Sequence, residues 1–495
     1  MSRVNILFIF TDQHALQAMG CYRDTPCQTP SLDALAARGA RFESAYTSCP
    51  LCLPARATIM TGHYPHRHGL TCNTDNTGNV AASLHELRDR PALLSRRLGA
   101  AGYRCGYSGK WHIGTDGGTL FDQTTEAALP KHFGFEGQNF PGHGSGGWHY
   151  PEYRQYLARH GLTLELDRDP NGVRACAATK GPDEVHVSHY ITDHTLSLID
   201  RYARGQEPFF IWHSFWGPHV PCFAPRRFVD MYRDLPVSPP PNFEDPHCAQ
   251  RLAWQVRRYG EELDWASWEI LVRYYYAFTT FIDYQVGRIL QHLETRGVAD
   301  NTIVIFSADH GDYLGCHGGL MDKGWGHYEE IQRIPLLVYV PPGLRGEHGA
   351  PDGSVFAEFA GLTDIYPTIL DAAGVAVEPG FAHGDSLLTL VRGEPVEWRD
   401  DIYVESYGTG HLPTTMFTGR MGDYKYGFNF GGTDELYNLG ADPHELDNRI
   451  DDPACADLVA EMRRRMRDWM TRTHYHPHGI REFSRCRGVT ADVAG

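Results

Sequence analysis

This chain of 495 residues lacks three features, and each absence excludes a class of protein. The apolar run near its start, Ile6–Phe10, is too short for a membrane span or for the core of a signal peptide. It has no excess of positive charge, and its formal net charge of −16 argues against general binding to nucleic acid or anionic membranes. Its 12 cysteines form no regular framework, which suits reduced thiols. We therefore expect a cytoplasmic protein that binds neither nucleic acid nor membrane.

What is present is the composition of a large globular protein, with 42% hydrophobic and 21% charged residues. A chain this long can bury a large core, and it exceeds the usual length of a single domain. The composition shifts around residues 375–395. We therefore predict a larger unit over residues 1–375 and a smaller C-terminal unit over residues 376–495.

Short, apolar runs recur along the larger unit and are typical of strands, and the first of them has the pattern of a parallel strand buried on both faces. These runs are Val4–Thr11, Tyr103–Ser108, Pro208–Phe215, Thr302–Ser307 and Ile334–Val340. Helical spacing of apolar residues predicts helices over Thr29–Gly39 and Glu269–Leu293, the second long enough to pack along a sheet. The larger unit is therefore predicted to have an α/β fold, with a large mixed, mostly parallel sheet between layers of helices.

The smaller unit is predicted to be an α+β subdomain. Alternation over Phe417–Phe430 predicts an antiparallel hairpin, and apolar residues from Leu458 to Trp469 recur at the spacing of a closing helix. From Thr471 onward the tail has no clear pattern, and we expect it to contact a partner subunit of a homo-oligomer.

Residues 115–185 are rich in glycine, histidine and aromatic residues and have poor periodicity. They are predicted to form a long insertion near the mouth of a site, where loops usually set specificity. Trp148 and Tyr150 in this stretch either stack on a sugar or aryl group or cover the core.

The most informative stretch is Ser48–Gly69, whose centre reads Cys52-Leu-Pro-Ala-Arg56. Pro54 suits the first position of a helix and Gly62 suits its left-handed end, so Cys52 is predicted to lie just before a helix N-terminus that favours an anion. Arg56 on the first turn can add a forked donor for a tetrahedral oxyanion. For Cys52 the alternatives are a buried structural thiol, a thiolate nucleophile, whose usual loop spaces Cys and Arg differently, or a metal or redox pair with Cys49.

Polar residues follow two of the predicted strands. Asp12 and Gln13 come after the first, and Asp309 and His310 come after Thr302–Ser307. Because ligands bind at the carboxyl edge of such sheets, these side chains are expected to meet there. Their oxygens suit a divalent cation, and His310 either ligates the metal or holds the nucleophile. The alternative for Asp12 and Gln13 is a simple turn after a strand.

A third strand leads into Lys110-Trp-His112. In an extended backbone these two side chains point to one side, where they would supply a cation and a base. The alternative is a surface lysine and a core histidine. Asn73 and His219, in polar or proline-rich surroundings, are each also compatible with a structural role.

Five segments in order resemble the type I sulfatases of the alkaline phosphatase superfamily, and the resemblance covers nearly the whole chain. They are C-x-P-x-R with T-G-x-Y-P-x-x-H-G from Cys52 to Gly69, G-K-W-H-I-G from Gly109, P-H-x-P around His219, and E-L-Y-N-L with D-P-x-E from Glu435. In addition, Lys323 in GLMDKGWGHYEE resembles the lysine of the family's G-K-x-x-x-Y-E segment. Ala55 departs from the serine more usual in the family, and Gln13 is more typical of its phosphonate monoester hydrolases.

The resemblance implies that Cys52 is oxidised after translation to formylglycine (3-oxoalanine) by a formylglycine-generating enzyme. The hydrate of this aldehyde would be the nucleophile. One divalent cation, Ca2+ by family default with Mn2+ or Mg2+ as alternatives, would be held by residue 52 together with Asp12, Gln13, Asp309 and His310.

The resemblance also assigns the remaining roles. Arg56, Lys110 and Lys323 would offset the charge of the sulfuryl group, and Asn73 would contact it. His219, with Lys323, would bind substrate and protonate the leaving oxygen, while His112 would remove the proton that lets the sulfated intermediate collapse. An ordinary serine could not eliminate sulfate in this way.

The expected function is hydrolysis of a small-molecule or saccharide sulfate ester to alcohol and sulfate. One alternative is a phosphonate monoester or phosphodiester hydrolase, which Gln13 and Asn73 favour and Lys110 and His112 disfavour. The other is a non-catalytic anion-binding relative, which would have no need of a modifiable nucleophile.

Overall fold

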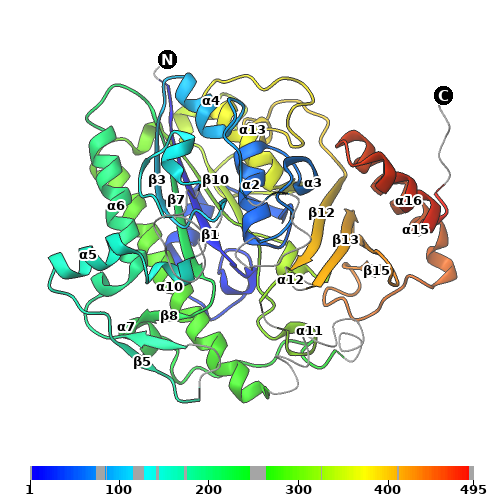
Figure 1. The fold of residues 1–495 in the computed structure, drawn as a ribbon, viewed down its shortest axis with the longest axis horizontal. Coiled ribbons are helices and arrows are strands. Elements are labelled where there is room, and N and C mark those ends of the chain that lie inside the picture. Colours follow the sequence, from blue (N-terminus) through cyan, green and yellow to red (C-terminus); the bar gives the residue numbers. More distant parts are fainter. Residues whose placement is uncertain are drawn as a thin grey trace.

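The computed structural model describes residues 3–73, 84, 86–114, 128–140, 144–171, 176–245, 263–320, 322–324, 326–409 and 412–489 (Figure 1). Within these ranges the largest sheet has eight strands in the order β11-β2-β10-β9-β1-β7-β3-β4. These strands are β1 (Asn5–Asp12), β2 (Ala40–Tyr46), β3 (Arg104–Gly109), β4 (Glu136–Gly137), β7 (Phe209–Pro218), β9 (Thr302–Ala308), β10 (Leu336–Tyr339) and β11 (Ser354–Gly361). All neighbours pair in parallel except β10, which is antiparallel to both β2 and β9. The predicted mixed, mostly parallel sheet is confirmed.

Helices cover both faces of this sheet (Figure 1). The helices are α1 (Pro30–Arg38), α2 (Cys52–Thr61), α3 (Pro65–His68), α4 (Leu94–Ala100), α5 (Pro151–Arg159), α6 (Val187–Tyr202), α7 (Arg226–Tyr232), α10 (Trp265–Thr295), α11 (Cys316–Gly319), α12 (Glu329–Gln332), α13 (Leu362–Ala372) and α14 (Leu387–Val391). Alternate residues of β1 enter two separate cores, because successive side chains of a strand point to opposite faces. Leu7 and Ile9 pack with α1, α6 and α10, whereas Ile6, Phe8 and Phe10 pack with α2, α4 and α13.

The C-terminal part contains an antiparallel sheet of β12 (Asp401–Thr409), β13 (Leu412–Met421), β14 (Tyr424–Asn429) and β15 (Glu435–Asn438). Strands β13 and β14 form the predicted hairpin. The predicted closing helix is α15 (Ala456–Arg472), which buries Met466 and Trp469 against this sheet. A third small sheet joins β5 (Leu166–Arg168), β6 (Ala177–Thr179) and β8 (Phe223–Pro225).

The tail after Thr471, in which the sequence shows no clear pattern, contains a helix, and its expected contact with a partner subunit stays a prediction. Residues 477–487 form α16 (Pro477–Arg487), which starts with proline and ends at Gly488 in the left-handed conformation. Phe483 packs its ring edge on Phe428 of β14, with 4.9 Å between ring centroids. The tail therefore packs on the sheet of its own chain. Ile480 of the same helix packs against the cluster that contains Phe483.

Two open questions from the sequence are resolved by burial. Tyr150 is 1% exposed and stacks on Phe140 with 4.1 Å between ring centroids, while Trp148 packs its edge on His186 at 4.7 Å. Both aromatic residues cover the core. Among the described residues, no helix combines the length and apolar character needed to cross a membrane.

Candidate active site

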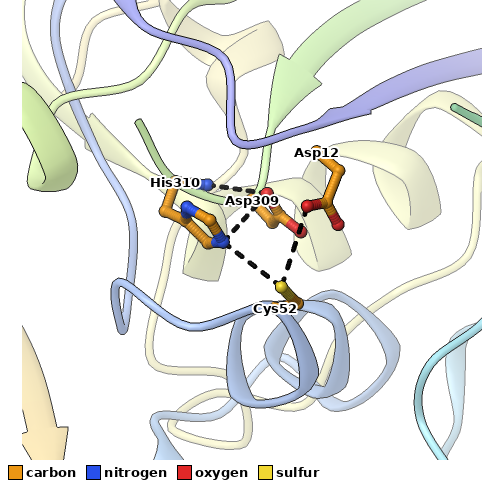
Figure 2. A group of neighbouring side chains, drawn as sticks. All are labelled: Asp12, Cys52, Asp309 and His310. Carbon is orange, nitrogen blue, oxygen red and sulfur yellow. Dashed lines mark hydrogen bonds and ion pairs between the residues drawn. The ribbon is translucent and has the colours of Figure 1, made fainter. Parts of the chain in front are cut away.

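Two parallel strands and one helix bring four side chains to the carboxyl edge of the large sheet. Strand β1 ends at Asp12, and Asp309 follows its parallel neighbour β9, with the Asp309 N–H donating to the Thr11 carbonyl at 3.2 Å. Helix α2 points its N-terminus at this edge, so that Cys52 faces His310 and Asp12 (Figure 2). Its Sγ lies 3.4 Å from His310 Nε2 and 3.7 Å from Asp12 Oδ1. One ligand atom from each of the four residues lies within 4.8 Å of all the others, and all four residues are buried.

Helix α2 begins two residues earlier than Pro54 suggested. Cys52 is its first residue, after Leu51 in an extended conformation, and Gly62 ends it with a φ of 74° as predicted. Proline is tolerated in the third position because none of the first four N–H groups of a helix has an intrahelical partner. One of these orphan donors, the Leu53 N–H, reaches Asn73 Oδ1 at 3.0 Å. Every residue of α2 is buried, so the position of Cys52 is fixed from all sides.

Arg56 is fully buried and joins the two carboxylates. Its Nη2 lies 2.8 Å from Asp12 Oδ2 and 3.1 Å from Asp309 Oδ2. Its Nη1 donates to the Lys110 carbonyl and to Ser214 Oγ, at 3.1 and 2.7 Å. The guanidinium therefore holds the walls of the site in place, and its contact with a substrate oxygen stays a prediction.

Lys110 and His112 both lie in the buried interior, which excludes the alternative of a surface lysine. Lys110 Nζ contacts Asp12 Oδ2 at 2.5 Å. The premise of an extended backbone is wrong at His112, whose φ is 51°. The chain turns at this residue after β3, so the direction of its side chain does not follow from simple alternation.

A third set of contacts surrounds Lys323. Its Nζ lies 2.6 Å from Gln13 Oε1, 3.1 Å from Asp322 Oδ1, and in close contact with His219 Nε2. His219 Nε2 is also 4.0 Å from Asp12 Oδ1. The side chains of His219 and Lys323 are 12% and 7% exposed, whereas those of Asp12 and Asp309 are fully buried. His219 and Lys323 are therefore more exposed than the two carboxylates of this centre.

The charges of the site determine what each group can do. Burial opposes ionisation of Asp12, but Lys110, His219 and Arg56 outweigh it, so the pKa of Asp12 lies well below its usual value. Burial and the neighbouring Asp12 raise the pKa of Asp309 to about 7. The same two causes raise the pKa of the Cys52 thiol to about 12, so the unmodified sulfur is protonated and a poor nucleophile at neutral pH.

These donors fit a divalent cation. Burial and then Lys323 lower the pKa of His310 to about 3, so its imidazole is neutral and can offer a lone pair. The ligand set consists of two carboxylates, a neutral imidazole and the side chain of residue 52. Ca2+, Mn2+ and Mg2+ prefer oxygen ligands, so an oxygen at position 52 would suit them better than the sulfur of a cysteine. Gln13 is buried beside the group, but its amide oxygen accepts from Lys323, so its role as a ligand stays a prediction.

Three further residues were missed by the sequence reasoning. Asp312 accepts from Gln13 Nε2, Tyr275 donates to the Gln13 carbonyl at 2.6 Å, and Ser214 accepts from Arg56. Asp312 could have been found, because it lies three residues after Asp309 in the same Asp-His-Gly-Asp stretch. Tyr275 lies within a long helix, and its role depends on packing that the sequence does not disclose.

Comparison with known proteins agrees with this geometry. The model of the Sulfatase family matches residues 4–375, and that of the N-sulphoglucosamine sulphohydrolase C-terminal region matches residues 315–472. The uncharacterized sulfatase YidJ of Escherichia coli (strain K12) is 31% identical, over 95% of this chain and 88% of the relative. The N-acetylglucosamine-6-O-sulfatase of Bacteroides thetaiotaomicron is 27% identical, over 90% of this chain and 82% of the relative.

Among solved structures, the phosphonate monoester hydrolase of Agrobacterium radiobacter has a TM-score of 0.78 at 22% identity, and the match covers 95% of this chain and 96% of that one. At this identity the likeness shows the fold alone.

Proposed function

Since the chain belongs to the sulfatase family and is a sulfuric ester hydrolase, we propose that it cleaves its substrate with a formylglycine hydrate at position 52 and one divalent cation. The observation that carries this proposal is the buried group of Asp12, Cys52, Asp309 and His310 at the N-terminus of α2. A protonated thiol in this position is a poor nucleophile, whereas an aldehyde hydrate supplies a hydroxyl oxygen to the same point.

Asp12, Asp309 and His310 would hold the cation together with residue 52, and Gln13 would complete the set. When bound, the cation supplies positive charge that polarises the sulfate oxygens and favours attack at sulfur. Lys110 and Lys323 add positive charge on two further sides, where it offsets the charge that develops on the transferred group.

Bond breaking requires a proton for the leaving alcohol. Lys323 stays protonated, because Asp322, Cys52 and Asp12 outweigh its burial and raise its pKa. Its Nζ donates to His219 Nε2, while His219 Nδ1 contacts the Val220 carbonyl. The proton shared by Lys323 and His219 would therefore go to the ester oxygen as the bond from that oxygen to sulfur breaks.

Release of sulfate requires a base. We assign this role to His112, which is buried after β3 within the same stretch as Lys110. It would take the proton of the second hydroxyl on the carbon of residue 52. The carbonyl then re-forms, the bond from this carbon to the sulfate oxygen breaks, and water regenerates the hydrate.

The substrate class we propose is a sulfated saccharide, with glucosamine sulfate as the first probe. The support is the named activity of the Bacteroides relative, together with the match to the N-sulphoglucosamine sulphohydrolase C-terminal model. The alternative of a phosphonate monoester hydrolase is favoured by Gln13. It is disfavoured by Lys110, which contacts Asp12, and by the histidine at position 112, which is buried.

Peptide mass spectrometry across Cys52, combined with assays on glucosamine 6-sulfate, 4-nitrophenyl sulfate and a 4-nitrophenyl phosphonate, tests this proposal. We expect a mass about 18 Da below that of the cysteine peptide, the difference between a thiol and an aldehyde side chain, and sulfate release in proportion to the modified fraction. An unmodified thiol in a fully active enzyme would contradict the nucleophile. Preferred turnover of the phosphonate would contradict the substrate class and leave the nucleophile standing.

A further inference from the structure

Gln13 occupies a restrained position beside the four metal-binding side chains. Its φ is 60°, in a region that non-glycine residues seldom adopt. Its N–H donates to Asp309 Oδ1 at 2.9 Å, and its carbonyl accepts from the Tyr275 hydroxyl at 2.6 Å. The same hydroxyl accepts from the Ala15 N–H at 2.8 Å, which ties the following turn to α10. The main chain of Gln13 is therefore held on both sides.

The remaining freedom of this residue is the direction of its amide, because the oxygen and nitrogen ends differ only in their hydrogen-bonding capacity. The amide oxygen accepts from Lys323 Nζ at 2.6 Å, and the amide nitrogen donates to Asp312 Oδ2. Reversal of the amide would point N–H groups at an ammonium and an oxygen at a carboxylate. Since Gln13 and Asp312 are buried, 0% and 1% exposed, water cannot relieve those two repulsions.

Asp312 is itself fixed as a double acceptor. Its Oδ1 accepts the Leu314 N–H at 2.8 Å, and its Oδ2 accepts from Gln13. A carboxylate can accept at both oxygens. An asparagine has only one oxygen, so one of these two donors would lose its acceptor.

We propose that Asp312 is a positioning residue for the proposed metal-binding group: it fixes the Gln13 amide so that its oxygen, and not its nitrogen, faces Lys323. This inference rests on the proposed function, since it gives Gln13 the ligand role that the cation would require. The partner that orients a ligand usually contributes strongly to metal affinity, and its substitution weakens binding by about 10- to 100-fold.

The first test is Asp312→Asn in the full-length protein. The Leu314 N–H retains the single oxygen, so the new amide nitrogen faces Gln13 and forces the Gln13 amide to reverse. We expect the affinity for Ca2+, measured by titration calorimetry on metal-free protein without substrate, to fall about 10- to 100-fold. Sulfate turnover at limiting Ca2+ should fall in parallel and recover at saturating Ca2+.

The matched control is Asp322→Asn. Asp322 is a carboxylate of the same neighbourhood, 3.1 Å from Lys323, but the structure gives it no bond to Gln13. A loss of Ca2+ affinity equal to that of Asp312→Asn would mean that general charge is responsible, and it would overturn the positioning role.

The decisive test is rescue by exchange of the two groups. In the double variant Gln13→Glu with Asp312→Asn, the asparagine nitrogen donates to the carboxylate introduced at position 13, whose other oxygen accepts from Lys323. Every contact is restored with the same total charge, so we expect Ca2+ affinity at or above that of the unaltered protein. A double variant that binds no better than Asp312→Asn, although its melting temperature is normal, would overturn the inference.

The same titration separates this inference from the proposed function. If the unaltered protein binds Ca2+ and Asp312→Asn binds it equally well, the positioning role is wrong and the proposed function stands. If the unaltered protein shows sulfate turnover but binds no divalent cation, both the metal-dependent mechanism and the positioning role are wrong.

Discussion

Two groups of neighbouring histidine and carboxylate side chains in this molecule shift the pKa of their histidines in opposite directions. The first, the proposed catalytic group, consists of Asp12, Cys52, Asp309 and His310. The second, the His317 group, consists of His317, Glu330 and Glu445, whose ligand atoms also lie within 4.8 Å of one another. Burial and Lys323 lower the pKa of His310 to about 3. Burial also acts on His317, but Glu330 and Asp245 outweigh it and raise its pKa to about 9.

The difference lies in the neighbours rather than in the ligands. His317 Nδ1 lies 3.2 Å from Asp245 Oδ2 and Nε2 lies 3.1 Å from Glu330 Oε2, and the ring stacks on Tyr328 at 3.5 Å. Glu445 accepts the Glu329 N–H at 2.7 Å and pairs with Lys425 of β14. An imidazole between two carboxylates keeps its proton and holds the fold, whereas one beside two lysines keeps a lone pair for a metal.

The largest effect that separates the two groups is expected from Cys52→Ala. Without an attacking oxygen, sulfate-ester turnover should fall by at least about 10,000-fold. The free energy of unfolding should change little by comparison, and both quantities are measured on one preparation by product assay and urea titration. Substantial turnover by the alanine variant would exclude residue 52 as the nucleophile.

The opposite result is expected for His317→Ala. Removal of one partner from a buried ion pair leaves two carboxylates without compensation, and it should lower the free energy of unfolding by about 3 to 5 kcal/mol. Protein that remains folded should retain its Ca2+ affinity. If Ca2+ affinity is lost while stability is kept, the His317 group is a metal site and the comparison is wrong.

The pH dependence of stability should carry the signature of His317. Its pKa rises from an ordinary value near 6.5 to about 9 on folding, so the native state binds this proton more tightly. The resulting stability is fully present below about pH 6.5 and is lost as the pH rises through about 9, in total about 3 kcal/mol. Urea unfolding at intervals from pH 6 to 9 should show this fall, and His317→Gln should remove most of it. An equal slope in both proteins would assign the proton elsewhere.

The smallest of these effects is the response to metal. Ca2+ at about 100 times its dissociation constant should stabilise the protein by about 2.7 kcal/mol relative to protein in chelator. His310→Ala should lose most of this gain, and His317→Gln should keep it. The melting temperature of each protein with and without Ca2+ provides the measurement, and equal gains in both variants would remove His310 from the ligand set.

The sequence predicted the proposed catalytic group better than its surroundings for a physical reason. Strands buried on both faces are continuously apolar, so β1 and β9 were visible, and parallel strands end at a common edge, which joined Asp12 to Asp309. The His317 group was not visible. More than a hundred residues separate Glu330 from Glu445 in the sequence. Tertiary packing brings the members of this group together, and no local sequence pattern predicts such an ion pair. The left-handed backbone at His112 escaped prediction because tertiary packing imposes it on a residue with no glycine-like signal.

The complete burial of α2 imposes an order of events on the maturation of the enzyme. Cys52 is 0% exposed, and the other nine residues of its helix are buried with it. A modifying enzyme needs access to the thiol, and the finished fold exposes neither Cys52 nor the helix that carries it. The proposed oxidation must therefore happen while the chain is still being made or is unfolded. On the proposed mechanism, a molecule that folds before oxidation would keep its thiol and stay inactive.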